Sequence, residues 1–248
     1  MSLSSSSPHL QLPPLAVVCD IESLFVDRAT GVRLALDAVA RSRGRRWRSA
    51  IDGSDLHQRS LSECLVEIAG DEADPALPAL AERYWCEYTR HARFAAPLHR
   101  DARAIIERVA DLGAEWHFVS TDGPEVATRL VRALGLAGQL STVYTPQAGI
   151  CRRARSALME NYIKGRSQPA DAHLVISDEL FEIVAAHRLG VPTLAVANGQ
   201  TPAPVLEAIP LSVGVARTLD EAADWIEAQL LARDCLAASA ARQQARLH

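Results

Sequence analysis

The chain has 248 residues, enough for one large hydrophobic core or for a core with a smaller attached domain. Its formal net charge of −4 provides no general attraction to nucleic acid or to an anionic membrane. The 5 cysteines have no C-x-x-C spacing, and no apolar stretch reaches the roughly 18 residues that span a membrane. We therefore expect a soluble, cytoplasmic protein with reduced thiols and with neither a nucleic-acid nor a membrane partner. Residues 1–14 lack the basic start and apolar centre of a secretory signal, and we expect them to be disordered.

The first predicted element is a buried strand over residues 15–19, with the sequence Leu-Ala-Val-Val-Cys. It is followed at once by Asp20. In an open α/β sheet, ligands bind at the carboxyl ends of the strands, and catalytic groups are found there. Asp20 is therefore the first candidate for a functional residue.

The next region, residues 29–95, is predicted to be helical throughout. Its apolar residues recur at the three- and four-residue spacing of helices, and no convincing strand interrupts them. Because this region directly follows the first strand, we expect a helical cap domain over the carboxyl end of that strand. The cap would be inserted between the two parts of a core domain, residues 15–28 and 96–232.

After Pro97 the pattern alternates between buried strands and amphipathic helices. The expected strands are residues 116–119, 142–144, 174–176 and 193–197, and the expected helices are 102–112, 124–134, 154–163, 181–189 and 219–231. Residues 233–248 are expected to extend the last helix or to fray. Alternation of this kind indicates an α/β fold, a doubly wound parallel sheet with helices on both faces.

Two further strand ends carry polar side chains. Ser120 and Thr121 follow the second predicted strand, and Asp178 comes shortly after the fourth. Together with Asp20, Asp178 gives the sheet two strand-end carboxylates. Such a pair indicates a metal ion, and Mg²⁺ prefers oxygen ligands of this kind.

This order of parts resembles the haloacid dehalogenase-like hydrolase superfamily, and within it the helical-cap branch that includes phosphoglycolate-phosphatase-like enzymes. The resemblance covers nearly the whole chain, residues 15–230. Four local segments carry it: Val17 to Glu22, His117 to Thr121, the basic pair Arg152-Arg153, and Ser177-Asp178 with Glu182. It implies a Rossmann-like core with an inserted helical cap, and a hydrolase activity.

The resemblance also implies roles for individual residues. Asp20 would attack phosphorus and form an aspartyl-phosphate, and Glu22 would act as the general acid and base. The hydroxyl of Ser120 and the amide of Thr121 would hold a phosphate oxygen. Magnesium, bound by Asp20, Asp178 and the backbone carbonyl of Glu22, would neutralise the phosphate charge that otherwise repels a carboxylate nucleophile.

The family also uses a basic residue, usually lysine, to bridge the nucleophile and the phosphate. Arg152 lies about 25 residues before Asp178 and is the best match by distance, with Arg153 next to it. Lys164, the only lysine, has the preferred chemistry but lies 14 residues before Asp178. We take Arg152 as the phosphate-binding residue, and Arg153 and Lys164 remain alternatives.

Several positions depart from the family pattern. Glu22 stands where phosphatases of the family have aspartate, and Ser23 and Ser177 stand where glycine is usual. The extra methylene of Glu22 moves its carboxyl by about 1 Å, a misplacement that can cost roughly 100-fold in rate. Three functions stay open. They are a magnesium-dependent phosphatase acting on a small phosphorylated metabolite, a non-catalytic binding or regulatory protein, and a 2-haloacid dehalogenase-type hydrolase, which would use no metal.

The helical region offers further candidates. Residues 52–54 occupy the place of a substrate-specificity loop in the related enzymes, and Arg59 could meet an anionic substrate. The arginine-rich run 41–48 is more typical of a solvated helix end than of a nucleic-acid site. The aromatic surfaces at Tyr84-Trp85 and Trp47 could serve a homodimer.

Overall fold

The computed structural model describes residues 13–47, 59–146, 155–197, 201–209, 211 and 214–245. Its centre is a six-stranded parallel sheet with the strand order β3-β2-β1-β4-β5-β6. The strands are β1 (Ala16–Cys19), β2 (Glu115–Val119), β3 (Thr142–Tyr144), β4 (His173–Ser177), β5 (Thr193–Val196) and β6 (Gly214–Ala216). The predicted α/β class is confirmed, and β6 is a strand that the sequence pattern did not predict.

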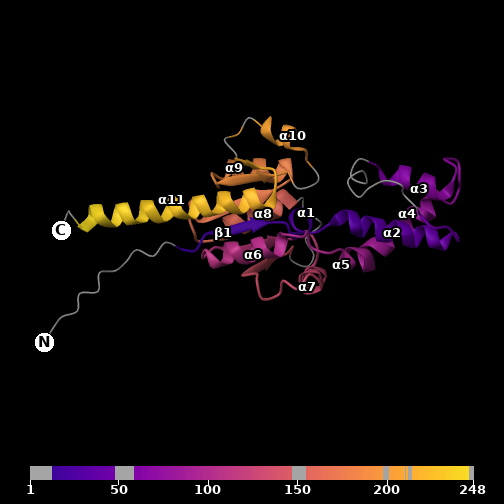
Figure 1. Ribbon diagram of the computed structural model, residues 1–248, viewed down its shortest axis with the longest axis horizontal. Coiled ribbons are helices and arrows are strands. Elements are labelled where there is room, and N and C mark those ends of the chain that lie inside the picture. The colour runs from indigo at the N-terminus through magenta and orange to yellow at the C-terminus, as the bar shows by residue number, and fades with distance from the viewer. Residues whose placement is uncertain are drawn as a thin grey trace.

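Helices cover both faces of this sheet (Figure 1). One face packs against α6 (Ala102–Asp111), α7 (Pro124–Ala133) and α11 (Leu219–Ala245), and the other against α8 (Arg155–Lys164) and α9 (Leu180–Arg188). A short helix, α10 (Ala203–Glu207), lies beside β5 and β6. The sheet is therefore doubly wound, with its strand order reversing at β1.

The central strand β1 is buried on both sides. Val17 and Cys19 belong to the apolar core on one face of the sheet, and Val18 belongs to the core on the other. Successive side chains of a strand point to opposite faces, so a strand covered on both faces needs apolar residues at every position. This explains the unbroken apolar run that predicted the strand.

The last helix, α11, continues to Ala245, so the tail extends the helix, which was one of the two outcomes expected for it. Its first turns are buried, and Ala223 and Ile226 are fully covered. Farther along, Leu231 and Leu236 are 61% and 72% exposed. The reason is visible in Figure 1, where the end of α11 projects beyond the sheet.

Between β1 and α6 the chain forms a group of helices that we call the helical segment. It consists of α2 (Arg28–Ser42), α3 (Leu61–Ala69), α4 (Leu77–Glu87), the π-helical turn η2 (Tyr88–Ala92) and α5 (Arg93–Ala95). These helices share an apolar core of their own, which includes Leu36, Leu65 and Leu80. The helical segment follows a single helical turn, α1 (Ile21–Leu24), and lies beyond the carboxyl end of β1 (Figure 1).

Helix α3 shows how local sequence signals set the ends of these helices. The Ser60 hydroxyl accepts a hydrogen bond from the Glu63 backbone N–H, and the Glu63 carboxylate accepts one from the Ser60 backbone N–H. This reciprocal capping box satisfies two donors that the first turn leaves unpaired. The helix ends at Gly70, whose φ of +89° is accessible to glycine without strain.

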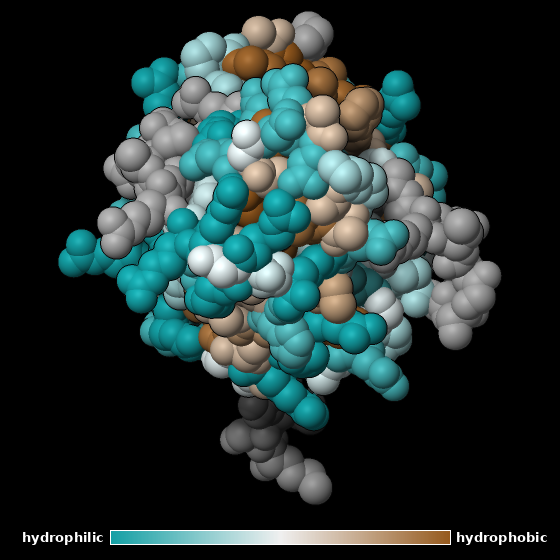
Figure 2. All heavy atoms as spheres, turned by 90° about the vertical axis from the view of Figure 1, so that its right-hand side faces the viewer, coloured by the Kyte–Doolittle hydropathy of each residue, from teal (hydrophilic) through white to brown (hydrophobic). Residues whose placement is uncertain are grey.

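Figure 2 views the molecule from the end formed by the helical segment. The surface on this side is mostly hydrophilic, with apolar side chains gathered near the upper margin of the view. Trp85 is 54% exposed and packs edge-on against Tyr84 and Tyr88. Residues 52–54 lie outside the described residues. Within the described ranges, no helix has both the length and the apolar character needed to cross a membrane.

Candidate active site

Three predicted site residues follow three neighbouring strands. Strand β1 lies between β2 and β4, and all three are parallel. When the strand registers are continued, by one residue toward β2 and by two toward β4, Asp20 is level with the last residue of each of these strands. Ser120 and Asp178 then come one residue farther along. The topology thus brings Asp20, Ser120 and Asp178 to one edge of the sheet.

Asp20 is held in a fixed orientation at this edge. It is only 6% exposed, and its Oδ1 accepts a hydrogen bond of 3.0 Å from the backbone N–H of Glu22. It thereby caps the amino end of α1. Asp20 and Ser120 border the same small cavity, whose other walls are side chains of β2, α7 and neighbouring residues.

Asp178 is a fully buried carboxylate. Within the described parts of the chain, neither of its oxygens has a hydrogen-bond partner of normal geometry. Burial raises the pKa of Asp178 to about 6, the nearby Ser23 hydroxyl opposes this shift, and the charge of Asp20 adds to it. A buried carboxylate in this situation is stabilised either by a proton or by a cation.

The donor set at this edge fits a magnesium ion. Asp20 and Asp178 supply two carboxylates close enough to raise a pKa through their mutual repulsion, and the oxygens of Asp178 have no hydrogen-bond partner of normal geometry among the described residues. No cluster of three or more His, Cys, Asp or Glu side chains suited to a metal occurs among the described residues. Magnesium is commonly bound by one or two carboxylates and retains several waters, so two are sufficient.

Ser177, which stands where the family usually has glycine, contacts Glu182. The Ser177 hydroxyl donates a hydrogen bond of 2.6 Å to Glu182, and both residues are buried. The same hydroxyl accepts one from the Glu179 backbone N–H at 2.9 Å. Ser177 and Glu182 therefore form a hydrogen-bonded pair that fixes the turn after β4.

Glu22 does not point freely into solvent. Its carboxylate pairs with Arg93 of α5, whose Nε donates to Glu22 Oε1 at 3.1 Å and whose Nη2 contacts Glu22 Oε2. The same guanidinium donates to both carboxylate oxygens of Asp122, at 3.2 and 2.6 Å. We call Arg93, Glu22 and Asp122 the Arg93 clamp. Burial raises the pKa of Glu22, and the charge of Arg93 opposes that shift.

Sequence reasoning missed Arg93 and Asp122. Asp122 stands two residues after Ser120 in the same turn, and the sequence analysis assigned it no role. Arg93 is one of 25 arginines, at the end of a helical stretch with no motif around it. Its apolar neighbours Ala92 and Phe94 are the only local signal that it could be buried.

Ser120 lies in a tight polar turn after β2. Its hydroxyl accepts a hydrogen bond of 3.1 Å from the backbone N–H of Asp122, and its own backbone N–H donates to the Tyr144 carbonyl at 2.9 Å. Thr121, between Ser120 and Asp122, is half-buried. The hydroxyl and the amide that the resemblance assigns to a phosphate oxygen are therefore both on a turn tied to β3.

The candidates for the bridging basic residue divide in two groups. Arg152 and Arg153 lie outside the described residues. Lys164 is the last residue of α8, is exposed, and pairs with Glu160 at 3.0 Å. From Lys164 the chain continues into the amino end of β4, at the opposite edge of the sheet from Asp178. The structure therefore does not bring Lys164 to the site.

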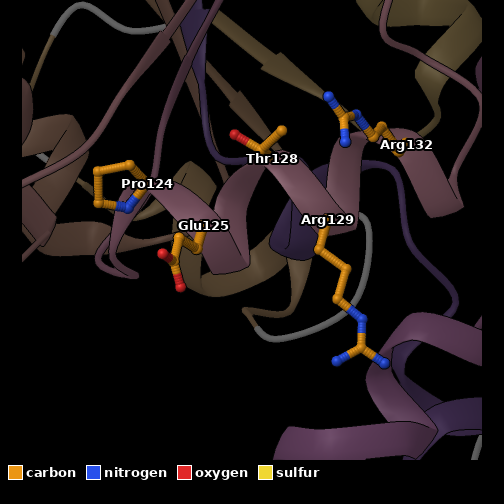
Figure 3. A pocket seen from close by; sticks show the side chains of 5 residues that line it. All are labelled: Pro124, Glu125, Thr128, Arg129 and Arg132. Atoms are coloured by element: carbon orange, nitrogen blue, oxygen red, sulfur yellow. The ribbon is translucent and has the colours of Figure 1, made fainter.

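An open groove of about 440 Å³ lies on α7, just after the Ser120 turn, and Figure 3 shows its lining. Its two arginines point in different directions. Arg129 reaches toward the helical segment, where its guanidinium lies 3.9 Å from the Phe94 ring centroid and donates to the Arg90 carbonyl. Arg132 points away from it. These side chains do not converge on one ligand, and Arg129 serves to join α7 to the helical segment.

The sequence by itself matches no family model and no curated protein. The structure is more informative, because its fold is similar to that of solved haloacid dehalogenase-like hydrolases. The fold expected from the resemblance is therefore confirmed.

Three solved structures illustrate the similarity. A haloacid dehalogenase-like family hydrolase from Streptococcus pneumoniae has a TM-score of 0.62 at 14% identity, covering 86% of this chain and 98% of the other. A family hydrolase from Deinococcus radiodurans, solved with bound phosphate and sodium, has a TM-score of 0.63 at 16% identity over 89% and 98%. A predicted phosphatase from Clostridium acetobutylicum has a TM-score of 0.61 at 14% identity over 87% and 99%.

Proposed function

We infer that the chain is a magnesium-dependent hydrolase, a phosphatase that acts on a small phosphorylated metabolite with Asp20 as its nucleophile. One observation carries this proposal. Asp20, Ser120 and Asp178 follow three adjacent parallel strands, and Asp178 is a fully buried carboxylate without a hydrogen-bond partner in the described chain. An acid kept in that environment destabilises the fold, and a cation-dependent site is the simplest reason to keep it.

The chemistry proposed for the site has two displacements. In the first, a carboxylate oxygen of Asp20 forms a bond to phosphorus while the bond to the leaving oxygen breaks, and Glu22 gives that oxygen a proton. In the second, Glu22 takes a proton from water, whose oxygen attacks phosphorus and releases Asp20. The hydroxyl of Ser120 and the amide of Thr121 would hold the non-bridging oxygens in line.

When bound, magnesium would neutralise the negative charge of the phosphate that otherwise repels the Asp20 carboxylate. Asp20, Asp178 and the backbone carbonyl of Glu22 would hold it. Arg152 would supply the remaining positive charge near the phosphate. These assignments follow from the resemblance and from the donor chemistry at this edge of the sheet.

The experiment is hydrolysis of a generic aryl phosphate by the purified protein, measured with magnesium and with a chelator. We expect turnover that needs magnesium, and its loss in Asp20→Asn, a variant that keeps the shape of the side chain but replaces the nucleophilic carboxylate with a neutral amide. An Asp20→Asn protein as active as the wild type would rule out the nucleophile assignment. Circular dichroism of the variant guards against a folding artefact.

A second candidate is a non-catalytic binding or regulatory protein on the same fold. It is favoured by the departures from the family pattern at Glu22, Ser23 and Ser177. The two candidates differ in one measurement. Magnesium-dependent turnover supports the phosphatase, whereas binding of magnesium and phosphate without turnover supports the binding protein.

A further inference from the structure

Arg93 is unusual for its burial. Among the residues that the structure describes, it is the only buried arginine, with 8% of its surface exposed. Taking a guanidinium out of water is costly unless carboxylates with good geometry surround it. Glu22 and Asp122 provide two such carboxylates, and all four of their oxygens accept from the same planar group.

The clamp joins three separate parts of the chain. Arg93 belongs to α5, the last helix of the helical segment before the chain returns to the sheet. Glu22 lies in α1, directly after β1, and Asp122 lies in the turn after β2. These contacts span 71 and 29 residues of sequence. A single side chain therefore ties the base of the helical segment to both strand-end loops.

Each carboxylate in the clamp is also linked to a predicted site residue. The backbone N–H of Glu22 donates to Asp20 Oδ1 at 3.0 Å. The backbone N–H of Asp122 donates to the Ser120 hydroxyl oxygen at 3.1 Å. Arg93 is thus connected through Glu22 to Asp20, the proposed nucleophile. Through Asp122 it is connected to the hydroxyl of Ser120.

We propose that Arg93 is a positioning residue, which fixes the carboxylate of Glu22 and the turn of Ser120 relative to Asp20. This rests on the function proposed above. Glutamate has one more rotatable bond than aspartate, so an unrestrained Glu22 would sample many positions. A planar fork that holds both of its oxygens removes this freedom, and so allows glutamate to serve where the family usually has aspartate.

The principal test compares Arg93→Ala with Arg90→Ala, a matched control in which the arginine is exposed on the neighbouring helical turn. For Arg93→Ala we expect kcat for an aryl phosphate to fall by about 100-fold with KM nearly unchanged, because Arg93 orients Glu22 and does not touch substrate. Guanidinium ion at a low, non-denaturing concentration should restore part of this kcat. It should restore nothing in Arg90→Ala or in the wild type, and sodium chloride serves as the ionic-strength control.

Arg93→Lys keeps the charge but loses the planar fork, and it covers the case in which Arg93→Ala does not fold. Its kcat should lie between those of the wild type and Arg93→Ala. Full activity in Arg93→Lys, an effect confined to KM, or a folded Arg93→Ala that guanidinium cannot rescue would each overturn the positioning role.

A second measurement does not depend on turnover. Thermal unfolding of Glu22→Gln, Arg93→Met and the double variant should give midpoint losses that are far from additive, since either change breaks the same contact. Additive losses would overturn the clamp itself. A different result is non-additive losses combined with a wild-type protein that hydrolyses no phosphate ester. In that case the proposed function fails, and Arg93 has a purely structural role. This result also overturns its positioning role.

Discussion

The carboxyl edge of the sheet and the core of the helical segment are built from opposite kinds of residue. At the sheet edge, buried charged groups lie side by side: Asp20, Asp178, Glu182 and Arg93 are all less than 10% exposed. The helical segment encloses an apolar core, in which Leu36, Leu65 and Leu80 are buried with little polar interruption. Buried charges in general lower stability, and apolar packing raises it. Among the described residues, the buried Asp, Glu and Arg side chains all lie at this edge of the sheet, which is the candidate site.

The largest effect is expected from Asp178→Asn, which removes one of the buried charged groups at the sheet edge. Activity with magnesium should fall by roughly 100-fold or more, because one of the two carboxylates proposed to hold the cation is lost. In the presence of a chelator the same variant should be more stable at pH 7, by up to about 3 kcal/mol. Aryl phosphate hydrolysis and urea unfolding measure the two quantities.

The sign of the stability effect follows from the pKa of Asp178, which burial raises to about 6 from its ordinary value of 3.8. The folded protein keeps a proton there that the unfolded chain has released, so wild-type stability falls as the pH rises from 4 to 6. The gain in Asp178→Asn should therefore vanish near pH 4. A variant that is less stable than the wild type at pH 7 would contradict the assignment of Asp178 as a destabilising buried acid.

For Leu36→Ala we expect the opposite result, in which stability falls and activity is kept. Leu36 is fully buried in the core of the helical segment, so its truncation should lower the free energy of unfolding by about 3 kcal/mol. The kcat of the folded variant should stay close to that of the wild type, because Leu36 lies in an apolar cluster away from the strand ends. Urea unfolding and steady-state kinetics distinguish this outcome from a role of Leu36 in catalysis, which would lower kcat in the folded protein.

A smaller, pH-dependent effect on stability is expected from two buried histidines in β2 and β4. His117 and His173 are buried, and burial lowers the pKa of both. As the pH falls below about 6.5, the unfolded chain takes up protons that the folded protein excludes, so each histidine reduces stability by at most about 1.4 kcal/mol per pH unit.

This effect can be separated from that of Asp178 by comparing slopes. Between pH 7 and 5, the stability of His173→Gln should fall less steeply than that of the wild type. The stability of His187→Gln, which changes an exposed position, should fall as steeply as that of the wild type. Urea midpoints across this range provide the measurement. Equal slopes in the two variants would show that His173 is not excluded from protonation by folding.

The smallest effect is expected at Lys164. Its ion pair with Glu160 is exposed and one helical turn apart, so Lys164→Ala should change the free energy of unfolding by less than about 0.5 kcal/mol. Activity should stay at the wild-type level, because Lys164 lies toward the amino end of β4. A large loss of kcat in this variant would restore Lys164 as the bridging base and displace Arg152.

Much of the fold was predictable because its signals are local. The strand before Asp20 and the centre of the strand before Asp178, residues 174–176, are unbroken apolar runs, which only a strand buried on both faces requires. Strand β6 was missed since it has three residues, begins with Gly214 and is only partly buried. The full length of α11 was not fixed either, because its alanine-rich end projects beyond the sheet, where no apolar pattern marks a stop.

The amino-acid pattern alone predicted the order of the first five strands, the helical insertion after β1, and the acids at the ends of β1 and β4. These are properties of short windows, where periodicity and side-chain type decide. Only the tertiary structure decided that Asp178 is buried without a hydrogen-bond partner in the described chain, and that Arg93 holds Glu22 and Asp122. Both depend on residues far apart in sequence meeting at one edge of the sheet, and no local pattern encodes which arginine of 25 will be there.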